Sequence, residues 1–426
     1  MSLERRLRAV VGDSHVLTDP DTHAAYVLDW TRRWSGRARL VVRPGSTVQT
    51  AAVVQACAAD GTPVVTQGGN TGLVGGGIPH GEPPQVLLST RRLTRLDPVD
   101  PVAGQLTAGA GVTLWRVHEH ARAAGWAYGV DLAARDSATV GGTVATNAGG
   151  VRVCAYGDTR RQVVGLEAVL ADGSVISHLG GLVKDNTGYD LTGLLTGSEG
   201  TLGVVTAARL RLWPPPPPGV TLLLGCDSVT AALALLPRSG LRAAELLFAA
   251  GVELVQRVSG LAAPLARAWP VYLLLETDEL PDLPADVDAA VSPRLCAYRE
   301  RHTEAISTLG VPHKLDVALP LQRLAAFVEQ VLEVTAPHRT FLIGHVAEGN
   351  LHVNVVGPPP DDTAVDEAVL RLVAAHGGSI SAEHGIGVAK ASLLALNRSA
   401  AEIAAMRSLK RALDPGGLLN PGVLLA

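Results

Sequence analysis

Two histidines and a glutamate in the last quarter of the chain are of the residue types that bind a metal ion. Residues 344–354 read Gly-His-Val-Ala-Glu-Gly-Asn-Leu-His-Val-Asn, and Glu383 follows further along. If Glu348-Gly349 forms a two-residue hairpin loop, His345 and His352 stand directly opposite each other, with Cβ atoms ~5 Å apart. Two imidazoles so placed can share one cation through bonds of ~2.0–2.1 Å, and Glu383 would complete a three-ligand site with open positions. Taken alone, two such histidines are more often surface residues.

A second group of polar side chains is suited to hold carboxylates. Arg299 and Thr303 are four residues apart in a helical stretch, which places them on one face of a helix, and Lys314 follows a turn at Gly310 and Pro312. An arginine can bind a carboxylate through two parallel hydrogen bonds, while the hydroxyl and the lysine add a donor and a positive charge. A solvated helix face has the same composition, so these residues alone leave both interpretations open.

Three glycine-rich stretches could hold a phosphorylated cofactor. They are residues 68–77, 137–150 and 197–206. The first follows a buried strand directly, and a backbone without side chains can there aim successive N–H groups at a diphosphate. Any one of these stretches alone is more often a turn than a cofactor site.

A partial nicotinamide fingerprint also occurs. Gly109-Ala110-Gly111 lies between an expected strand and an expected helix, and Asp131 follows about twenty residues later. Leu114 stands where the third glycine of that fingerprint belongs. We therefore interpret the segment as a tight strand-to-helix turn.

Taken in order, the three glycine-rich stretches resemble the FAD-domain motifs of the vanillyl-alcohol-oxidase superfamily of FAD-linked oxidases, whose FAD domain is called PCMH-type. The matching sequences are Gln-Gly-Gly-Asn-Thr-Gly-Leu-Val-Gly-Gly from residue 67, the stretch that ends Asn-Ala-Gly-Gly at residue 150, and Gly-Ser-Glu-Gly-Thr-Leu-Gly at 197–203. Asn-Pro-Gly at 420–422 resembles the C-terminal segment that returns from the cap domain to touch the flavin. The resemblance covers nearly the whole chain and implies FAD as cofactor. The residues that it places on FAD are Gly68, Gly69, Asn70, Thr71, Gly72, Leu73, Ser137, Gly141, Gly142, Thr146, Asn147, Gly149, Glu199, Gly200, Gly203, Val204 and Asn420.

The resemblance also bears on how FAD is held. Many members of the superfamily attach it covalently through a histidine in the first loop or a cysteine in another. Asn70 occupies the first of these positions, and no cysteine lies in the FAD motifs. We therefore expect noncovalent FAD.

Members of this superfamily that oxidise D-2-hydroxy acids carry a Gly-His-x-x-Asp-Gly-Asn-Leu-His motif and a Glu-His-Gly motif. By that match His345, His352 and Glu383 are ligands of a divalent metal ion, and His384 is the catalytic base. Zinc is the expected ion, with manganese and iron as alternatives. Ala347-Glu348 stands where Gly-Asp is usual, and this turn position removes no catalytic group.

The resemblance further implies a substrate. In the D-2-hydroxyglutarate dehydrogenase branch the residues that match Arg299, Thr303 and Lys314 contact the substrate, and Asn354 is expected beside them. Lactate- and glycolate-oxidising relatives usually lack the lysine, so Lys314 favours a dicarboxylate. The implied chemistry is metal-assisted removal of the hydroxyl proton by His384 and hydride transfer from C2 to the flavin, which yields a 2-oxo acid. D-Lactate or glycolate is the alternative substrate.

Two functions from other classes compete with this interpretation. One is a metal-dependent hydrolase in which the flavin is only structural, and the other is a flavin-binding relative without activity. Three complete FAD motifs, with the metal-binding residues in the cap domain, argue against the hydrolase. The filled catalytic positions argue against the inactive relative.

The elements that must position these residues indicate an α+β chain. Five prolines at 214–218 form a stiff segment that neither a helix nor a central strand can absorb, so we place a domain boundary there. Expected strands are 38–42, 63–67, 106–110, a pair around Asp172-Gly173, 221–225, 271–276, 340–346 and 351–356, and expected helices are 48–59 and 115–124. The predicted organisation is a PCMH-type FAD-binding domain of two subdomains over 1–213, an antiparallel α+β cap domain of the FAD-linked oxidase C-terminal type over 214–410, and a returning segment over 411–426.

Composition narrows the partners and the compartment. Lys plus Arg number 36 against 40 for Asp plus Glu, so no global field favours nucleic acid or an anionic membrane. No apolar run approaches the ~18 residues of a membrane span, residues 1–11 lack a signal sequence, and the four cysteines are scattered. We expect a cytoplasmic enzyme that acts on a small 2-hydroxy acid and uses an unidentified electron acceptor. A homodimer is one candidate assembly.

Overall fold

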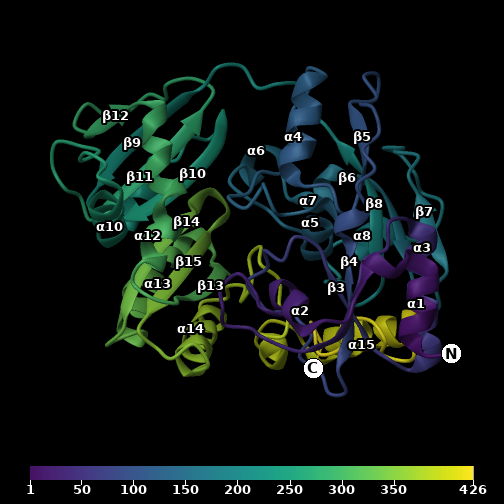
Figure 1. Cartoon of the computed structure of the whole chain (residues 1–426). Helices are drawn as coiled ribbons and strands as arrows, with labels where there is room; N and C mark the ends of the chain where they lie inside the picture. Colours follow the sequence, from purple (N-terminus) through teal and green to yellow (C-terminus); the bar gives the residue numbers. More distant parts are fainter. Residues whose placement is uncertain (426) are drawn as a thin grey trace. The chain divides into compact units, whose positions relative to one another are not determined.

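The computed structural model describes residues 1–425, which pack into two compact units. The first unit comprises residues 1–150, 156–215 and the chain from His384 onward, and the second comprises 151–155 and 216–383. The chain passes from the first unit to the second within the proline run, between Pro215 and Pro216. Figure 1 labels the elements along the chain. Within the described residues no helix is both long and apolar enough to cross a membrane.

The first unit begins with a sheet whose strand order is β1-β2-β4-β3. Its strands are β1 (Val16–Leu17), β2 (Ala38–Val42), β3 (Val64–Gln67) and β4 (Gln85–Ser89). β4 pairs in parallel with both β2 and β3. Helix α3 (Thr47–Asp60) joins β2 to β3, and it begins at Ser46, whose side chain accepts a hydrogen bond from the amide of Gln49. The predicted strand, helix and strand over residues 38–67 are thus confirmed.

A second sheet of the first unit is antiparallel, with the order β5-β8-β6-β7. Its strands are β5 (Gln105–Gly109), β6 (Val163–Val169), β7 (Val175–His178) and β8 (Val204–Arg211). β6 and β7 form the hairpin predicted at Asp172-Gly173, where Gly173 has φ +82°. A Cβ atom on Gly109 or Gly111 would lie 2.3 Å from a backbone oxygen, so the partial nicotinamide fingerprint is a close backbone crossing.

Helices of the first unit complete its two cores. They are α1 (Leu3–Val11), α2 (Pro20–Val27), α4 (Leu114–Ala123), α5 (Val140–Thr146), α7 (Thr159–Gln162), α8 (Leu191–Leu195) and α15 (Ala400–Leu413), and α6 (Val153–Tyr156) lies where the chain crosses between the units. Leu418 and Leu419 pack in the core of the first sheet, and the amide of Val64 donates to the carbonyl of Leu418 at 2.8 Å. The segment that returns to the first unit starts at His384, earlier than the predicted 411.

The second unit is built on a seven-stranded antiparallel sheet with the order β12-β9-β11-β10-β14-β15-β13. The strands are β9 (Val220–Cys226), β10 (Leu241–Phe248), β11 (Val271–Thr277), β12 (Ala289–Val291), β13 (His313–Ala318), β14 (Arg339–His345) and β15 (Asn350–Val356). The four strands predicted here and the mostly antiparallel α+β class are confirmed. β10, β12 and β13 were not predicted.

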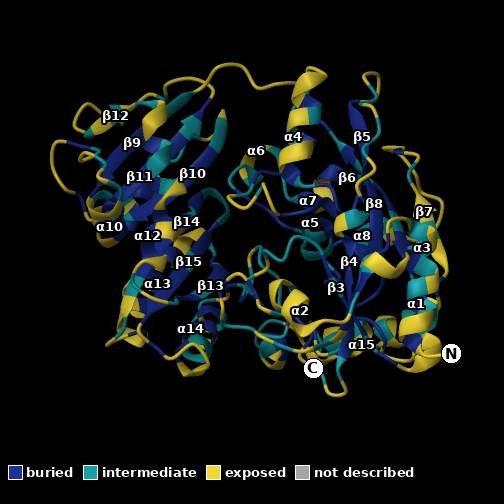
Figure 2. Ribbon diagram, in the orientation of Figure 1, coloured by how far each residue is buried: buried dark blue, intermediate teal, exposed yellow. Residues whose placement is uncertain are grey.

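Helices of the second unit fall into two groups. They are α9 (Val229–Ala234), α10 (Ala249–Ser259), α11 (Cys296–Glu300), α12 (His302–Ser307), α13 (Leu321–Val334) and α14 (Ala364–Ala375). Val255 of α10 and Ile306 of α12 share a core cluster with Leu247 and Ile343 of the sheet. α13 packs with α9 and α14 instead. Figure 2 shows most residues of the strands of this sheet in dark blue, as buried, with the exception of the edge strand β12.

Candidate functional site

Polar side chains form a row across one face of the seven-stranded sheet. Residues paired across antiparallel strands lie on the same face, as do residues two apart in one strand. Glu245 pairs with His345, Ile343 pairs with His352, and His352 pairs with Asp316, so these residues all share a face. By the same pairing the row, which we call the polar row, consists of Glu276, Glu245, His345, His352, Asn354, Asp316 and Lys314.

The predicted opposition of His345 and His352 is wrong. Ile343, not His345, is the residue of β14 that pairs with His352. The cause is the loop, which is longer than two residues: a 3₁₀ turn spans Val346–Glu348, and Gly349 follows it with φ +72°. His345 and His352 are therefore diagonal neighbours on one face. Their rings still approach edge to face, with centroids 5.3 Å apart.

His345 is held between two carboxylates. Its Nδ1 lies 2.8 Å from Oε1 of Glu245, and its Nε2 lies 3.8 Å from Oε1 of Glu383. Glu245 is only 1% exposed. Burial by itself lowers the pKa of His345, but the charge and hydrogen bond of Glu245, together with the charge of Glu383, outweigh it and raise that pKa to about 10.

His352 has a similar environment. Its Nδ1 lies 3.5 Å from Oδ1 of Asp316, and its Nε2 lies 3.6 Å from Oε1 of Glu383. Asp316 is fully buried, and its Oδ2 accepts hydrogen bonds from the amides of Ala382 at 3.1 Å and Glu383 at 2.7 Å. Its Oδ1 accepts from Nδ2 of Asn350 at 2.7 Å. Asp316 thus orients both the ring of His352 and the backbone that carries Glu383.

The convergence of the two rings on Glu383 fits a metal ion. A tetrahedral ion with bonds of ~2.1 Å separates its ligand atoms by about 3.4 Å, close to the 3.6 and 3.8 Å found between each Nε2 and the Glu383 oxygen. Histidines that bind metals through one ring nitrogen usually donate from the other to a carboxylate, as the positions of Glu245 and Asp316 allow here. Asp316, His352, Glu383 and the next residue, His384, also offer ligand atoms that all lie within 4.8 Å of one another.

The predicted carboxylate-binding residues are not all brought together. The helical stretch that contains them is two short helices, α11 and α12, joined at Arg301. Nη1 of Arg299 lies 2.8 Å from Oε1 of Glu276 and 3.8 Å from Oε1 of Glu245, which ties Arg299 to the polar row. Thr303, by contrast, is exposed. The expected shared face of Arg299 and Thr303 therefore gains no support from the contacts.

Lys314 and Asn354 are paired across β13 and β15 at one end of the polar row. Lys314 is half-buried, and burial lowers its pKa to about 8. Asn354 is buried, and its Nδ2 donates to the carbonyl oxygen of Phe341 at 3.3 Å. Both are placed on the face that carries the two histidines.

The first glycine-rich stretch of the first unit has backbone N–H groups that could bind a ligand. The N–H groups of residues 69–73 make no hydrogen bond with any other described residue. A Cβ atom on Gly68 would lie 2.4 Å from Oγ1 of Thr139, and one on Gly69 would lie 2.0 Å from the carbonyl oxygen of Ser137. These glycines therefore let the first and second stretches cross closely. A run of unpaired amides at such a crossing fits a diphosphate.

The third stretch joins the same region through backbone hydrogen bonds. The amide of Gly197 donates to the carbonyl of Val144 at 2.9 Å, and that of Glu199 donates to Ala145 at 2.8 Å. The first unit thus brings all three glycine-rich stretches together, as the resemblance implies. Predicted FAD contacts of their individual residues stay predictions.

Glu199 and Asn420, both predicted on FAD, use their polar groups within the protein. The carboxylate of Glu199 accepts from the amides of Ile386 at 2.8 Å and Gly387 at 2.7 Å, and burial raises its pKa. Nδ2 of Asn420 donates to the carbonyl of Glu199 at 2.8 Å, and its Oδ1 accepts from the amide of Thr66 at 2.8 Å. These bonds attach the C-terminal segment to the first unit.

Comparisons with known proteins agree with this architecture. Residues 38–178 match the family described as FAD binding domain, and residues 215–424 match FAD linked oxidases, C-terminal domain. D-2-hydroxyglutarate dehydrogenase of Xanthomonas citri pv. viticola is 38% identical over 98% of this chain and 96% of its own. The mitochondrial D-2-hydroxyglutarate dehydrogenase of Bos taurus is 36% identical over 96% of this chain and 81% of its own.

The chain belongs to the FAD-linked oxidase family. It is therefore an FAD-dependent oxidoreductase. The solved structure of 4-ethylphenol oxidase from Gulosibacter chungangensis has the same fold, with a TM-score of 0.78 at 18% identity over 99% of this chain and 96% of that one.

Three carboxylates of this FAD-linked oxidase were missed by sequence reasoning. Glu245 stands in Ala-Ala-Glu-Leu-Leu, where a single acid interrupts an apolar run, and that interruption was the available signal. Asp316 is two residues from Lys314 in a strand that was not predicted. Glu276 ends a predicted strand and carried no signal of its own.

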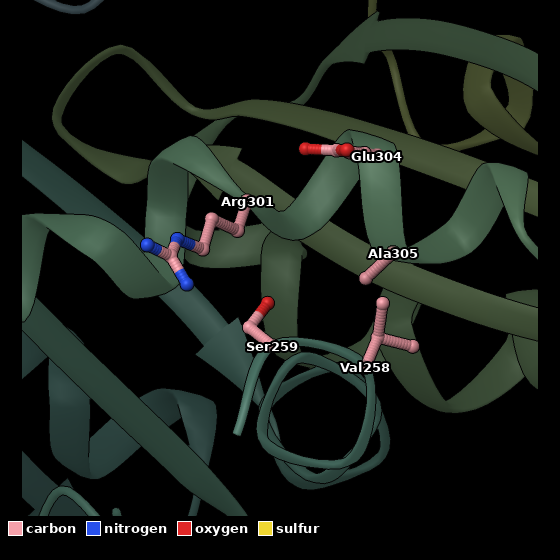
Figure 3. Close-up of a pocket in the computed structure, with 5 residues that line it drawn as sticks. All are labelled: Val258, Ser259, Arg301, Glu304 and Ala305. Carbon is pink, nitrogen blue, oxygen red and sulfur yellow. The ribbon is translucent and has the colours of Figure 1, made fainter. Parts of the chain in front are cut away.

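A separate hollow of the second unit contains none of the predicted site residues. It lies between α10 and α12, has a volume of ≈ 330 Å³, and is lined by Val258, Ser259, Arg301, Glu304 and Ala305. In Figure 3 the guanidinium of Arg301 and the carboxylate of Glu304 lie apart from each other. The FAD-linked oxidase therefore presents no convergent set of polar groups there.

Proposed function

We propose that this FAD-linked oxidase is a dehydrogenase of D-2-hydroxy acids, with D-2-hydroxyglutarate as the preferred substrate, and that a divalent metal ion assists it. The observation that carries the proposal is the convergence of His345 and His352 on one oxygen of Glu383, in a row that also holds Lys314 and contacts Arg299. A 2-hydroxy acid requires a group that binds its hydroxyl, such as a metal ion, and cations beside it that bind its carboxylates.

His345, His352 and Glu383 would hold the ion. Both oxygens of Asp316 already accept hydrogen bonds, so we assign Asp316 the task of orienting the ligands rather than binding the metal. When bound, the ion supplies Lewis-acid stabilisation of a deprotonated 2-hydroxyl, and zinc is the expected species. His384, which directly follows Glu383, is the proposed base for the hydroxyl proton.

Charge supports a divalent ion at this place. Four carboxylates, those of Glu245, Glu276, Asp316 and Glu383, lie in or beside the polar row, whereas the cations are Arg299, Lys314 and Arg152, whose Nη2 is 3.8 Å from Glu276. Because Glu245 and Glu383 raise the pKa of His345 to about 10, its ring carries a proton at neutral pH when no ion is bound, and a divalent ion would take the place of that proton. A dianionic substrate would be repelled unless further positive charge were present.

Substrate binding then falls to residues of this chain. Arg299 has more N–H groups than Glu276 and Glu245 use, so it can still bind the carboxylate next to the hydroxyl. Lys314 and Asn354 would take the second carboxylate. Bound FAD supplies the hydride acceptor, and the names of the relatives at 36–38% identity support D-2-hydroxyglutarate as the substrate. The electron acceptor, a cytoplasmic location and a homodimer stay predictions.

The test is reduction of the protein-bound flavin without oxygen by a panel of 2-hydroxy acids, with metal analysis of the same sample. We expect D-2-hydroxyglutarate to bleach the flavin absorbance at about stoichiometric metal content, and the L-enantiomer not to. Preference for D-lactate or glycolate would replace the dicarboxylate assignment with the alternative substrate. An unreduced flavin with every acid would refute the dehydrogenase itself.

A further inference from the structure

Glu245 contacts both halves of the proposed site. Its Oε1 lies 2.8 Å from Nδ1 of His345 and 3.8 Å from Nη1 of Arg299. We propose that Glu245 is the positioning residue that fixes the metal-binding histidine and the carboxylate-binding arginine relative to each other. The metal subsite and the substrate subsite then both depend on this one side chain. This inference rests on the proposed function.

The sheet places Glu245 for this role. β10 lies between β11 and β14, and Glu245 is paired directly with His345 across the β10–β14 ladder. A carboxylate at Nδ1 accepts a hydrogen bond from the N–H group there, so that Nε2 is the nitrogen that can bind a metal ion. The Nε2 atom of His345 is the one that faces Glu383. When an ion replaces the proton on Nε2, the hydrogen bond to Glu245 would therefore keep the remaining proton on Nδ1.

The burial of Glu245 is not what a purely structural ion pair would favour. It is 1% exposed, yet its Oε2 has no hydrogen-bond partner anywhere in residues 1–425. In Asp316, the other buried carboxylate of the polar row, both oxygens accept hydrogen bonds. Burying a carboxylate oxygen without a donor is costly, and such exceptions call for a functional explanation. The contacts of its Oε1 with His345 and Arg299 are the functional explanation here.

Glu276 provides the matched control for Glu245. It pairs with the same arginine, at 2.8 Å, and it lies on the neighbouring strand of the same sheet face. Its charged contacts are to Arg299 and Arg152, and it has no ion pair or hydrogen bond with His345 among the described residues. Removing its charge should therefore disturb the substrate subsite and leave the metal subsite in place.

The experiment measures metal affinity and steady-state kinetics on the FAD-loaded protein for Glu245→Gln, Glu245→Asp and Glu276→Gln. Metal affinity is measured for zinc alone, by competition with a chelator. Asp278→Asn, which breaks an exposed pair with Arg242, serves as a remote control. We expect Glu245→Gln to weaken zinc binding by about 10–100-fold, to lower kcat and to raise KM. Glu245→Asp should recover part of the zinc affinity, because the charge is kept.

Glu276→Gln should raise KM while zinc affinity stays within about twofold of the wild type, and Asp278→Asn should change neither. Wild-type zinc affinity in Glu245→Gln would overturn the inference and leave the proposed function standing. An equal loss of zinc affinity in Glu276→Gln would also overturn it, because the effect would then be one of general charge. If Glu245→Gln does not fold, the test rests on Glu245→Asp. Its carboxylate is shorter by one methylene, so this variant should still bind zinc more weakly than the wild type. A wild-type protein that oxidises the acid without binding zinc would instead refute the metal-assisted function.

Discussion

Lys314 is the residue on which the choice between a dicarboxylate and a monocarboxylate substrate depends. If it pairs with the second carboxylate, Lys314→Ala leaves a desolvated charge unpaired and should cost about 2–5 kcal/mol in kcat/KM for D-2-hydroxyglutarate. D-Lactate lacks that carboxylate, so its kcat/KM should change little. Arg301→Ala, an exposed cation in the same unit, is the control. An equal loss for both acids would assign Lys314 to the shared carboxylate or to the fold.

The same lysine predicts a pH dependence. Burial lowers the pKa of Lys314 from 10.5 to about 8, so the charged form prevails below that pH and is lost as the pH rises through it. Since kcat/KM reports the free enzyme, the preference for D-2-hydroxyglutarate over D-lactate should fall as the pH passes about 8. The ratio of the two kcat/KM values is measured across that range. In Lys314→Ala the ratio should be independent of pH, and a decline retained in this variant would trace it to another group.

At the scale of elements, the turn between β14 and β15 decides how the two histidines meet. Gly349 has φ +72°, and a Cβ atom there would lie 2.1 Å from the carbonyl oxygen of Leu319. Gly349→Ala should therefore displace the turn, lower the free energy of unfolding by more than about 1–2 kcal/mol, and weaken metal binding. Gly377→Ala is the control, because Gly377 has φ +70° with no atom within 4 Å of a Cβ. Thermal unfolding and zinc titration of both variants provide the measurement, and equal effects would exclude a special role for this turn.

The strands of the second unit show where sequence periodicity fails. β10 is buried on both faces over Ala243–Leu247, so its sequence, Ala-Ala-Glu-Leu-Leu, lacks the alternation of a half-buried strand. β13 alternates from Lys314 to Val317, but the polar residues Lys314 and Asp316 lie on a face that is covered rather than solvated. Both strands carry residues of the proposed site. β10 and β13 belong to the sheet because they pair with strands distant in the sequence, and local sequence does not indicate that pairing.

At the scale of the whole molecule, the proposed metal ligands and the stretches proposed to bind FAD belong to different units. The three glycine-rich stretches lie in the first unit, and His345, His352 and Glu383 lie in the second. Chelation or His352→Ala should therefore abolish oxidation while FAD stays bound. Flavin absorbance after gel filtration reports FAD, and turnover reports activity. His376→Ala, which removes a half-buried histidine hydrogen-bonded to Gln330, is the control. Full activity of a metal-free preparation would remove the metal from the mechanism.

Sequence alone determined the family and the α+β class, and it predicted noncovalent FAD and the ligand set His345, His352 and Glu383, because these follow from short motifs whose residues are close along the chain. The tertiary structure decided what lies around those residues. It showed that His345 is diagonal to His352, because the turn at Gly349 is longer than two residues. It also brought Glu245 to His345, which lies 100 residues further along the chain, and Asp316 to His352, which lies 36 residues further along. These partners depend on which strands pair in a sheet whose strand order differs from the order along the chain. No local sequence pattern indicates which distant strand will lie beside a given strand.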